Sequence, residues 1–478
     1  MEIIHVSAEC YPVAKVGGLG DVVGALPKYQ AKSGHEVSVV MPMYRTKFLY
    51  DNEWDLVYEG KQNIGSHLFH YSIIKEKINK LGFDLYLIDI NNLLDREKVY
   101  GYDDDSERFI SFQIAVCDWL TNSKQTPDII HCHDHHTGFI PFMIKYCFAF
   151  NHQLANVPTI FTIHNAQYQG WLGWDKYFYV PPYDSWRYGL LEWKNMINPM
   201  AAAVKCAWKV TTVSPSYLEE IKFSANGLEN LFEFEKGKCS GILNGIDTQV
   251  WNPEIDTALI GNYDEDSVDK GKRINKQYLC NQFNLDLEKP LIVFIGRLVG
   301  EKAADLLPAA ISQSILQYNG NVNFLVLGSG DPVIEAQLEQ MKGRYIGYCN
   351  AYIGYQEKLS HIMYAGADFL LMPSRVEPCW LNQLYALRYG TVPMVRNTGG
   401  LRDTVRDLTE SNGFGLQFNE ATVGDITNAV GRAIDLYENY PEQFARIRSL
   451  MMGLDHSWDT SANHYIDLYD PLVKNIVS

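Results

Sequence analysis

The chain has 478 residues, of which 46% are hydrophobic and 21% charged, and these values exclude a disulfide-stapled miniprotein and a long disordered scaffold. Its formal net charge of −16 at pH 7, without a concentrated basic patch, disfavours nucleic acid and anionic lipid as partners. No uncharged apolar stretch approaches the roughly 18 residues of a membrane helix, so we expect no membrane partner.

The first part of the chain alternates short apolar runs with helical patterns. Runs rich in Ile and Val are expected to form strands at residues 2–9, 35–42, 83–90, 127–134, 158–165 and 209–215. Between the first two runs, a glycine loop leads into a helical pattern at residues 22–34. This alternation predicts a parallel, doubly wound α/β sheet.

Near residue 245 the pattern changes to turn-forming residues and a polar stretch, and a second series begins. Strands are expected at residues 291–296, 322–328, 344–349, 368–373 and 391–397. The sequence therefore predicts two Rossmann-like domains, residues 1–245 and 246–457, that face an interdomain cleft. Ligands of such sheets bind at the carboxyl ends of the strands, so functional residues should follow strands.

Residues 458–478 have the pattern of an amphipathic helix that is expected to pack back on the first domain. Trp458, Tyr465, Leu468 and Tyr469 are its candidates for burial. The nine cysteines are scattered without a CxxC pair, which is typical of reduced thiols, and the first residues show no secretory leader. We therefore expect a cytoplasmic protein.

The loop KVGGLGD joins the first expected strand to a helix. It contains Lys15 and the glycines Gly17, Gly18 and Gly20. Glycines allow backbone N–H groups to approach a ligand closely, and a helix N-terminus attracts anions. The spacing is not GxGxxG, which argues against a nicotinamide dehydrogenase, and a tight turn without a ligand is the alternative.

The run HCHDHHTG, residues 131–138, offers four histidines, a cysteine and an aspartate, which suggests a metal site. If the strand continued through this run, alternation would send positions 131, 133 and 135 to one side and positions 132, 134 and 136 to the other. A divided set disfavours zinc, and we expect His136 to donate a hydrogen bond at the end of the strand.

Two motifs of the second series offer charged groups after strands. GRLVGEK places Arg297 and Lys302 where a forked cation and a mobile cation would suit a diphosphate, although both could be solvated surface charges. SRVEPC places Glu377 before a helix whose first backbone N–H groups, near residues 379–381, could bind a phosphate. Glu377 could instead only cap that helix.

Motifs follow one another in a recognisable order along nearly the whole chain. They include KVGGLGDVVGALPK, PDIIHCHDHHTG, TIHNAQYQG, TTVSPSYLEE, GILNGIDTQVWNP, GRLVGEK, LGSGDP, SRVEPC and YGTVPMVRNTGGLRDTV. In this order and spacing they resemble bacterial glycogen synthase and plant starch synthase. That family consists of retaining glucosyltransferases with the two-Rossmann B-type fold.

The resemblance implies an activity and its partners. Glucose would pass from ADP-glucose, or from UDP-glucose, to the non-reducing 4-hydroxyl of an α-1,4-glucan with retention of configuration. The glucan would bind the first domain and the nucleotide sugar the second, and no metal or other cofactor would be needed. Front-face transfer is the preferred route to retention because no second motif carboxylate pairs with Glu377.

The resemblance also implies roles for individual residues. The catalytic residues would be Glu377, His136, Arg297 and Lys302. The residues that bind the donor would be Lys15, Gly17, Gly18, Asp21, Asn244, Tyr355, Cys379, Trp380 and Leu381, with Tyr355 stacking on the adenine. The residues that contact the acceptor or another sugar would be Glu9 and Asn165. Cations beside the diphosphate would stabilise the charge that grows there as the sugar–phosphate bond breaks.

Some positions depart from the family pattern. Trp380 and Ala303 stand where glycine is usual, Asn397 replaces the second residue of an arginine pair, and Ala201 stands where many members have lysine. If position 303 needs a positive φ, alanine would cost about 1 kcal/mol there. These departures motivate an alternative, a catalytically impaired glucan-binding or regulatory relative. A pyridoxal-dependent glucan phosphorylase shares the architecture but needs a Schiff-base lysine motif, which we do not find.

Overall fold

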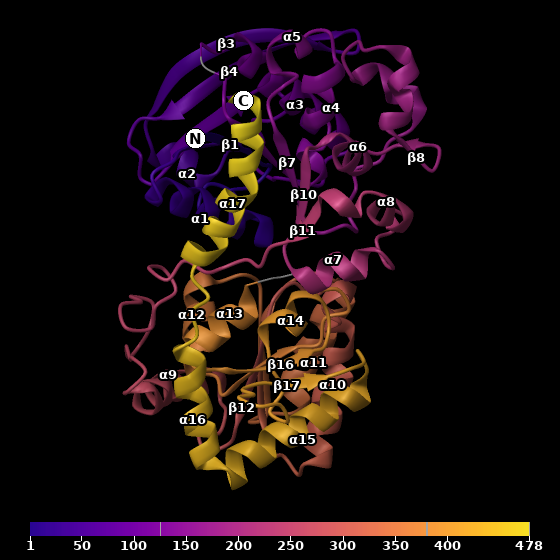
Figure 1. The fold of residues 1–478 in the computed structure, drawn as a ribbon. Helices are drawn as coiled ribbons and strands as arrows, with labels where there is room; N and C mark the ends of the chain where they lie inside the picture. Colours follow the sequence, from indigo (N-terminus) through magenta and orange to yellow (C-terminus); the bar gives the residue numbers. More distant parts are fainter. Residues whose placement is uncertain (125, 379–380, 478) are drawn as a thin grey trace. The chain divides into compact units, whose positions relative to one another are not determined.

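The computed structural model describes residues 1–124, 126–378 and 381–477, which form two compact units (Figure 1). The N-terminal unit contains Met1–Asn244 together with the segment that begins at Trp458, and the C-terminal unit contains Gly245–Ser457. Among the described residues, no helix is both long and apolar enough to cross a membrane. The described cysteines are free thiols.

A mixed sheet forms the centre of the N-terminal unit. Its strands, in spatial order, are β11 (Cys239–Gly241), β10 (Lys209–Thr212), β7 (Thr159–Ile163), β6 (Ile129–His133), β1 (Glu2–Val6), β2 (Glu36–Pro42), β5 (Asp84–Asp89), β4 (His67–Glu76) and β3 (Trp54–Ile64). All pairs are parallel except β3–β4 and β4–β5. Strands β6 and β7 are buried along their whole length, as expected for apolar runs inside a parallel sheet.

Helices and short helical turns complete this unit. The α-helices are α1 (Gly18–Lys32), α2 (Lys47–Asp51), α3 (Asp105–Asn122), α4 (Ile140–Tyr146), α5 (Asn151–Leu154), α6 (Pro199–Cys206), α7 (Pro215–Ile221), α8 (Glu229–Phe234) and α17 (Trp458–Val477). The 3₁₀ turns are η1 (His135–Thr137), η2 (Trp174–Tyr179), η3 (Ser185–Leu190) and η4 (Lys236–Lys238), and β8 (Glu192–Trp193) pairs with β9 (Met196–Ile197).

Helix α17 lies beside α1 and completes the core of the N-terminal unit (Figure 1). Trp458, Tyr465 and Tyr469 are fully buried in the cluster that also contains Leu26 and Tyr29 of α1. Their spacing places them on one face of the helix, which is the amphipathic pattern of the sequence. Of the residues expected to be buried on this helix, Leu468 is only partly buried.

The C-terminal unit contains a six-stranded parallel sheet. Its spatial order is β14 (Cys349–Ile353), β13 (Asn323–Gly328), β12 (Leu291–Ile295), β15 (Phe369–Met372), β16 (Val392–Arg396) and β17 (Leu416–Phe418). In chain order within the unit this is 3-2-1-4-5-6, the order of a Rossmann sheet. The predicted fold class, two Rossmann-like α/β units, is confirmed.

Helices connect these strands. They are α9 (Val268–Phe283), α10 (Leu307–Gln317), α11 (Pro332–Arg344), α12 (Glu357–Gly366), α13 (Asn382–Arg388), α14 (Gly399–Thr404), α15 (Val423–Asn439) and α16 (Pro441–Met452), with 3₁₀ turns η5 (Gly300–Lys302) and η6 (Ala304–Leu306). The strand expected at residues 344–349 is wrong, because α11 continues to Arg344. The chain then turns through Gly347, which has a φ of 86°, and the strand begins at Cys349.

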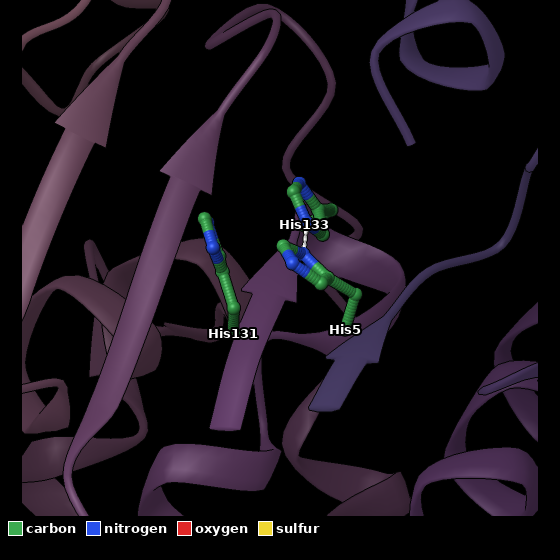
Figure 2. Close-up of side chains that lie close together, drawn as sticks. All are labelled: His5, His131 and His133. Carbon is green, nitrogen blue, oxygen red and sulfur yellow. Dashed lines mark hydrogen bonds between the residues drawn. The ribbon is translucent and has the colours of Figure 1, made fainter. Parts of the chain in front are cut away.

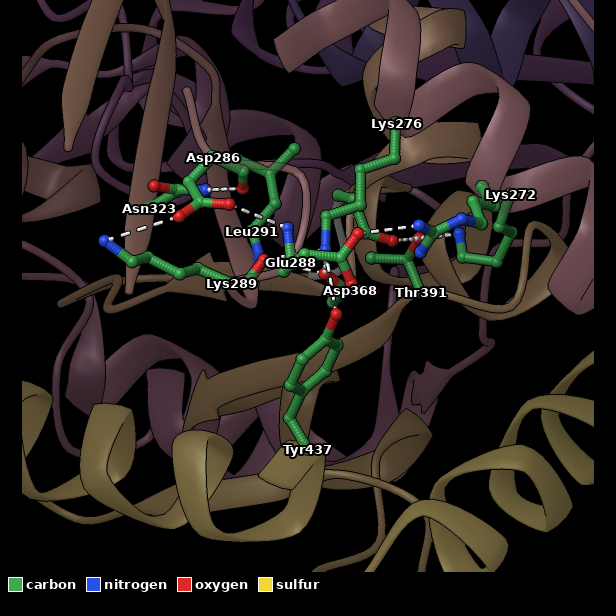
Figure 3. A network of polar contacts seen from close by, with 12 residues as sticks. Lys272, Lys276, Asp286, Glu288, Lys289, Leu291, Asn323, Asp368, Thr391 and Tyr437 are labelled. Carbon is green, nitrogen blue, oxygen red and sulfur yellow. Dashed lines mark hydrogen bonds and ion pairs between the residues drawn. The ribbon is translucent and has the colours of Figure 1, made fainter. Parts of the chain in front are cut away.

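A buried ion-pair network ties α9 and α16 to β15 (Figure 3). Asp368 lies 2.8 Å from Lys276 Nζ and 2.8 Å from an Arg448 nitrogen, and it accepts a hydrogen bond of 2.9 Å from Leu291 N–H. Burial alone would raise the pKa of Asp368, but the two cations and the N–H outweigh it and lower the pKa. The carboxylate is therefore charged and fully paired.

We expect Asp368→Asn to lower the free energy of unfolding of the C-terminal unit by about 3–5 kcal/mol, because the buried Lys276 loses its counter-charge and Arg448 keeps only its pair with Asp269. Urea denaturation measures the change. The matched control is Asp51→Asn, which breaks the exposed pair with Lys47 (2.6 Å) and should leave the free energy of unfolding nearly unchanged, because water screens that pair. Equal losses for the two variants would contradict the assignment.

Candidate functional site

The predicted functional residues follow strands at the points where strand order reverses. In the N-terminal unit, β1 lies between β2 and β6, so strands β2 to β5 extend the sheet on one side of β1 and the strands from β6 onward extend it on the other. In the C-terminal unit, β12 lies between β13 and β15 in the same way. Lys15 and His136 follow β1 and β6, while Lys302 and Glu377 follow β12 and β15. Open α/β sheets bind ligands at such switch points.

Glu9 organises the glycine loop after β1. Its Oε2 accepts hydrogen bonds from Val16 N–H (2.6 Å) and Gly17 N–H (3.1 Å), and its Oε1 accepts one from the Tyr100 hydroxyl (2.7 Å). Burial raises the pKa of Glu9 although these donors oppose the shift. Glu9 thus stabilises the loop by binding its backbone N–H groups. Its expected contact with an acceptor sugar stays a prediction.

The structure brings the other predicted residues of this loop together. Gly17 is the N-cap of α1, which begins at Gly18. Lys15 Nζ lies 2.8 Å from Asp21 Oδ1 in the first turn of that helix, and the two side chains are only partly exposed. The loop therefore presents a cation beside a helix N-terminus, an arrangement that suits an anionic ligand.

The histidine-rich run does not continue the strand as expected. Strand β6 ends at His133, and Asp134 has a φ of 57°, so the alternation predicted for positions 131–136 is wrong beyond residue 133. His135 and His136 lie in turn η1 with ring centroids 3.7 Å apart, on the same side rather than on opposite sides.

His136 is held by aromatic neighbours. Its ring stacks on Tyr100 with centroids 4.7 Å apart and meets the edge of Phe109 at 4.7 Å. Burial, and then the charges of His135 and Arg108, hold the pKa of His136 well below its ordinary value, so the ring is neutral. Its Nδ1 is buried without a hydrogen-bond partner among the described residues. A neutral imidazole with an unused nitrogen can bind a hydroxyl.

Tyr100 is a site residue that the sequence analysis missed. It bonds Glu9 through its hydroxyl and supports His136 with its ring, so it links the ends of β1 and β6. Its loop, KVYGYDDDS, offers no signal beyond two tyrosines near acidic residues.

Asp134 and Asn165 lie at the ends of the neighbouring strands β6 and β7. Asp134 Oδ1 accepts a hydrogen bond of 2.7 Å from His164 N–H, and Asn165 Oδ1 accepts one of 2.9 Å from Gln167 N–H. Burial raises the pKa of Asp134 to about 7, although hydrogen bonds from the backbone oppose the shift. Asn244 is buried at the end of the unit, after β11.

Glu377 and Lys302 form a buried ion pair in the C-terminal unit. Lys302 Nζ and the Ser374 hydroxyl each lie 2.7 Å from Glu377 Oε2, and Glu377 is 0% exposed. Burial lowers the pKa of Lys302, although the charge of Glu377 opposes the shift. Gly400 N–H, at the start of α14, donates to the main-chain carbonyl of Glu377 (3.0 Å). The carboxylate and the cation are thus positioned together.

The remaining predicted donor residues are spread around this pair. Arg297 lies 3.4 Å from Glu301 and is partly exposed. Tyr355 follows β14 with 70% of its surface exposed, and Leu381 is buried as the N-cap of α13. Cys379 and Trp380 lie outside the described residues, so their predicted donor contacts stay predictions.

The structure shows the surroundings of three departures from the family pattern. Ala303 has a φ of 53°, the left-handed conformation that favours glycine. Asn397 Oδ1 accepts a hydrogen bond of 3.0 Å from Arg402, while Arg396 donates to the Arg375 carbonyl at 2.9 Å. Arg396 thereby supports the segment that leads to Glu377. Ala201 is fully buried on α6.

Known proteins resemble the chain over its whole length. Residues 2–234 match the starch synthase catalytic domain, and residues 289–435 match the glycosyl transferases group 1. The chain is 52% identical to the glycogen synthase of Flavobacterium johnsoniae, over 99% of this chain and 100% of that one. A glycogen synthase of Streptococcus pneumoniae is 37% identical with the same coverage. The catalytic domain of starch synthase IV from Arabidopsis thaliana, solved with ADP and acarbose, matches with a TM-score of 0.91 at 32% identity, covering 99% of each chain.

The raised pKa of Asp134 predicts a pH dependence of stability. Between about pH 4 and pH 7 the folded protein keeps a proton on Asp134 that the unfolded chain has released, so the contribution of Asp134 to the free energy of unfolding falls as pH rises. The buried neutral histidines contribute a slope of opposite sign, so urea denaturation at pH 5 and pH 7 should show the effect of Asp134 as the difference between the wild-type protein and Asp134→Asn. Asp134→Asn should remove up to about 1.4 kcal/mol per pH unit of the slope. Identical slopes in both proteins would contradict the prediction.

The strained alanine after η5 predicts a stabilising substitution. Ala303→Gly should raise the free energy of unfolding by about 1 kcal/mol, because glycine adopts a positive φ without the Cβ clash. The control is Ala304→Gly at the next, equally buried position, which is not among the positive-φ residues. That variant should lose about 0.5–1 kcal/mol. Urea denaturation should therefore give opposite signs for the two variants.

Proposed function

The chain belongs to the glycogen and starch synthase family, and we propose that it transfers glucose from ADP-glucose, or from UDP-glucose, to the non-reducing 4-hydroxyl of an α-1,4-glucan. The full-length 52% identity to a glycogen synthase makes the protein a glycosyltransferase. The observation that carries the finer proposal is the buried Lys302–Glu377 pair after neighbouring strands of a Rossmann sheet. ADP in the related starch synthase structure supports an ADP-linked donor.

The proposed chemistry assigns the leaving group to cations of this chain. As the bond between the anomeric carbon and the diphosphate oxygen breaks, negative charge grows on the diphosphate. Arg297 and Lys302 would stabilise that charge, and Lys15 would bind the donor from the N-terminal unit. The proposal needs no metal, because these side chains supply the positive charge. Leu381 and the backbone near residues 379–380 would complete the phosphate site.

Glu377 would act beside the transferred glucose, not as a covalent nucleophile. Its Oε2 is held by Lys302 and Ser374, which supports an electrostatic role toward the positive charge of the sugar in the transition state. Retention would follow from front-face transfer. The acceptor hydroxyl would bond the anomeric carbon on the face that the diphosphate leaves, and its proton would pass to a departing phosphate oxygen.

Neutral groups of the N-terminal unit would bind sugar. His136 has an unused ring nitrogen, and Asn165 lies at the end of the adjacent strand. Glu9 would support the loop that carries Lys15, and Tyr355 would stack on the adenine from its exposed position after β14. The free, mostly buried thiols are consistent with action in the cytoplasm.

The alternative of an impaired glucan-binding relative is not favoured. The family's predicted catalytic charges Arg297, Lys302 and Glu377 are present, and the last two form the buried pair. Asn397 accepts a hydrogen bond from Arg402, and the left-handed conformation of Ala303 bears on stability. Backbone-mediated contacts tolerate side-chain changes better than the loss of a charge.

The test measures transfer of labelled glucose onto glycogen from ADP-glucose and UDP-glucose side by side. Glu377→Gln should lower kcat by about 100- to 1,000-fold, because it removes one preorganised charge from the transition state. Glu339→Gln, which breaks an exposed pair with Lys342 (3.1 Å), is the matched control and should leave kcat within twofold. No transfer from either donor by the wild-type chain, with glycogen still bound, would favour the impaired relative.

A further inference from the structure

A cavity of about 310 Å³ lies in the C-terminal unit, at the ends of α13 and α16. We call it the α13–α16 cavity. Its volume is near the lower end of the range for small-molecule sites, so it suits a small ligand. Its walls come from α13, from the end of α16 and the segment after it, and from the first residues of the unit. The lining includes Ile246, Thr248, Leu384, Arg388, Met452 and His456.

Both segments through which the chain enters and leaves the C-terminal unit line the α13–α16 cavity. The unit begins at Gly245 and ends at Ser457. Ile246 N–H donates to the His456 carbonyl at 2.8 Å, and Ile246 forms a parallel β-bridge with Ser457. The two segments are thus fixed side by side, and a molecule in the cavity would contact both of them together with α13.

Two basic side chains of the lining have nitrogens without a hydrogen-bond partner. Arg388 Nε and His456 Nε2 are buried, and neither finds a partner in the part of the chain that the structure describes. The contact that Arg388 Nη1 makes to the Met452 carbonyl is long, at 3.4 Å. A polar group that has lost its water without gaining a partner costs free energy, which a ligand that accepts hydrogen bonds would recover.

The buried histidines of the N-terminal unit differ from this pair because they satisfy one another. His5, His131 and His133 have ligand atoms within 4.8 Å of one another, which would admit a cation by distance alone. Their rings are stacked, however, with His131 and His133 inclined by 16° and His5 and His133 by 23° (Figure 2). Every ring nitrogen of the three is already hydrogen-bonded. They therefore offer a ligand no unused nitrogen.

His456 can donate together with Arg388. Burial lowers the pKa of His456, although the charge of Asp455 opposes the shift. The ring is therefore neutral at pH 7 and carries one N–H. An anion beside Nε2 would select the tautomer that is protonated there. The cavity then presents a cation from α13 and a neutral donor from the segment after α16.

These donors favour a phosphate group. A guanidinium donates in a planar fork that matches two oxygens of a phosphate or a carboxylate. A phosphate monoester has three terminal oxygens, so one remains for the histidine N–H, whereas a carboxylate has only two. The buried apolar side chains of Ile246, Leu384 and Met452 would contact the body that carries the phosphate.

One acidic side chain also lines the α13–α16 cavity. Asp455 is exposed, so water screens its charge. Its Oδ1 accepts a hydrogen bond of 2.9 Å from Ser457 N–H, and the hydrogen bonds with Ser457 lower the pKa of Asp455. The carboxylate is thus held by its own turn, which leaves Arg388 and His456 to an anion.

The α13–α16 cavity is separate from the diphosphate site that the sequence predicts. Leu381, one of the residues predicted to bind the donor, is the N-cap of α13, whereas Arg388 is the last residue of that helix. The rise of an α-helix puts about 10 Å along its axis between these two positions.

We propose that the α13–α16 cavity is a binding site for a small phosphate monoester, whose phosphate is held by Arg388 and His456 and whose body packs on Ile246, Leu384 and Met452. The site goes beyond the proposed glucosyl transfer and does not depend on it. The bound ligand joins α13 to the two segments that connect the C-terminal unit to the rest of the chain.

The first test measures the affinity of the full-length protein for phenyl phosphate, which joins a phosphate to a compact apolar ring. Isothermal titration calorimetry at saturating ADP, which fills the predicted donor site, should detect binding. Inorganic phosphate, which lacks the ring, should bind at least about tenfold more weakly. Arg388→Gln should raise the Kd for phenyl phosphate about 10- to 100-fold, and His456→Leu should raise it about three- to tenfold.

The matched control is Arg273→Gln on α9 of the same unit, which breaks an exposed pair with Glu288 (2.7 Å) and should leave the Kd within twofold. Equal weakening by Arg388→Gln and Arg273→Gln would show a nonspecific attraction to positive charge and overturn the proposal. Absence of binding by the wild-type protein would overturn it as well.

The second test locates the ligand and needs no change of charge. In the full-length protein labelled with ¹³C-methyl methionine, the Met452 signal is identified by its loss in Met452→Leu. It should shift when phenyl phosphate is added, and the shift should persist at saturating ADP. A Met452 signal that does not respond would overturn the proposal. A shift that ADP abolishes would place phenyl phosphate in the donor site and would overturn the proposal too.

Discussion

A carboxylate that is removed from water must find its hydrogen-bond donors inside the protein, and this requirement shapes the candidate residues of each unit. Glu9 accepts hydrogen bonds from two backbone N–H groups and a tyrosine hydroxyl, and these bonds fix the loop that carries Lys15. Glu377 accepts hydrogen bonds from Lys302 and Ser374. These bonds place a cation after β12 next to a carboxylate after β15. In each unit the need to satisfy one acid positions the groups that the proposed reaction uses.

The sequence predicted the strands that are continuous apolar runs, and it predicted the loops that follow them. The buried strands β1, β6, β7, β12, β13, β15 and β16 lie within the expected runs. The antiparallel pair β3–β4 was not expected, because its first strand is mostly exposed and reads as a mixed polar segment. The run at residues 344–349 is apolar enough for a strand, but Gly347 turns the chain before Cys349.

The sequence predicted individual side chains of the candidate site, but it did not predict which of them contact one another. The loop positions of Lys15, Lys302 and Glu377 follow from strand–loop–helix patterns, whereas their partners depend on which strands become neighbours. Tyr100 meets Glu9 across 91 positions, and His5 meets His133 across 128. The alternation expected for residues 131–136 was wrong because a single residue, Asp134, has a positive φ. Single-residue conformation of that kind has no periodic signal.

The place of α17 has a consequence for the order in which the protein is made. The helix begins at Trp458, after the whole C-terminal unit, yet it fills the core of the N-terminal unit and places Tyr469 against Gln30 and His131. During synthesis, the first unit to leave the ribosome therefore lacks part of its interior until α17 has been translated. The N-terminal unit is begun first but completed after the C-terminal unit. The C-terminal unit can therefore fold before α17 has packed onto the N-terminal unit.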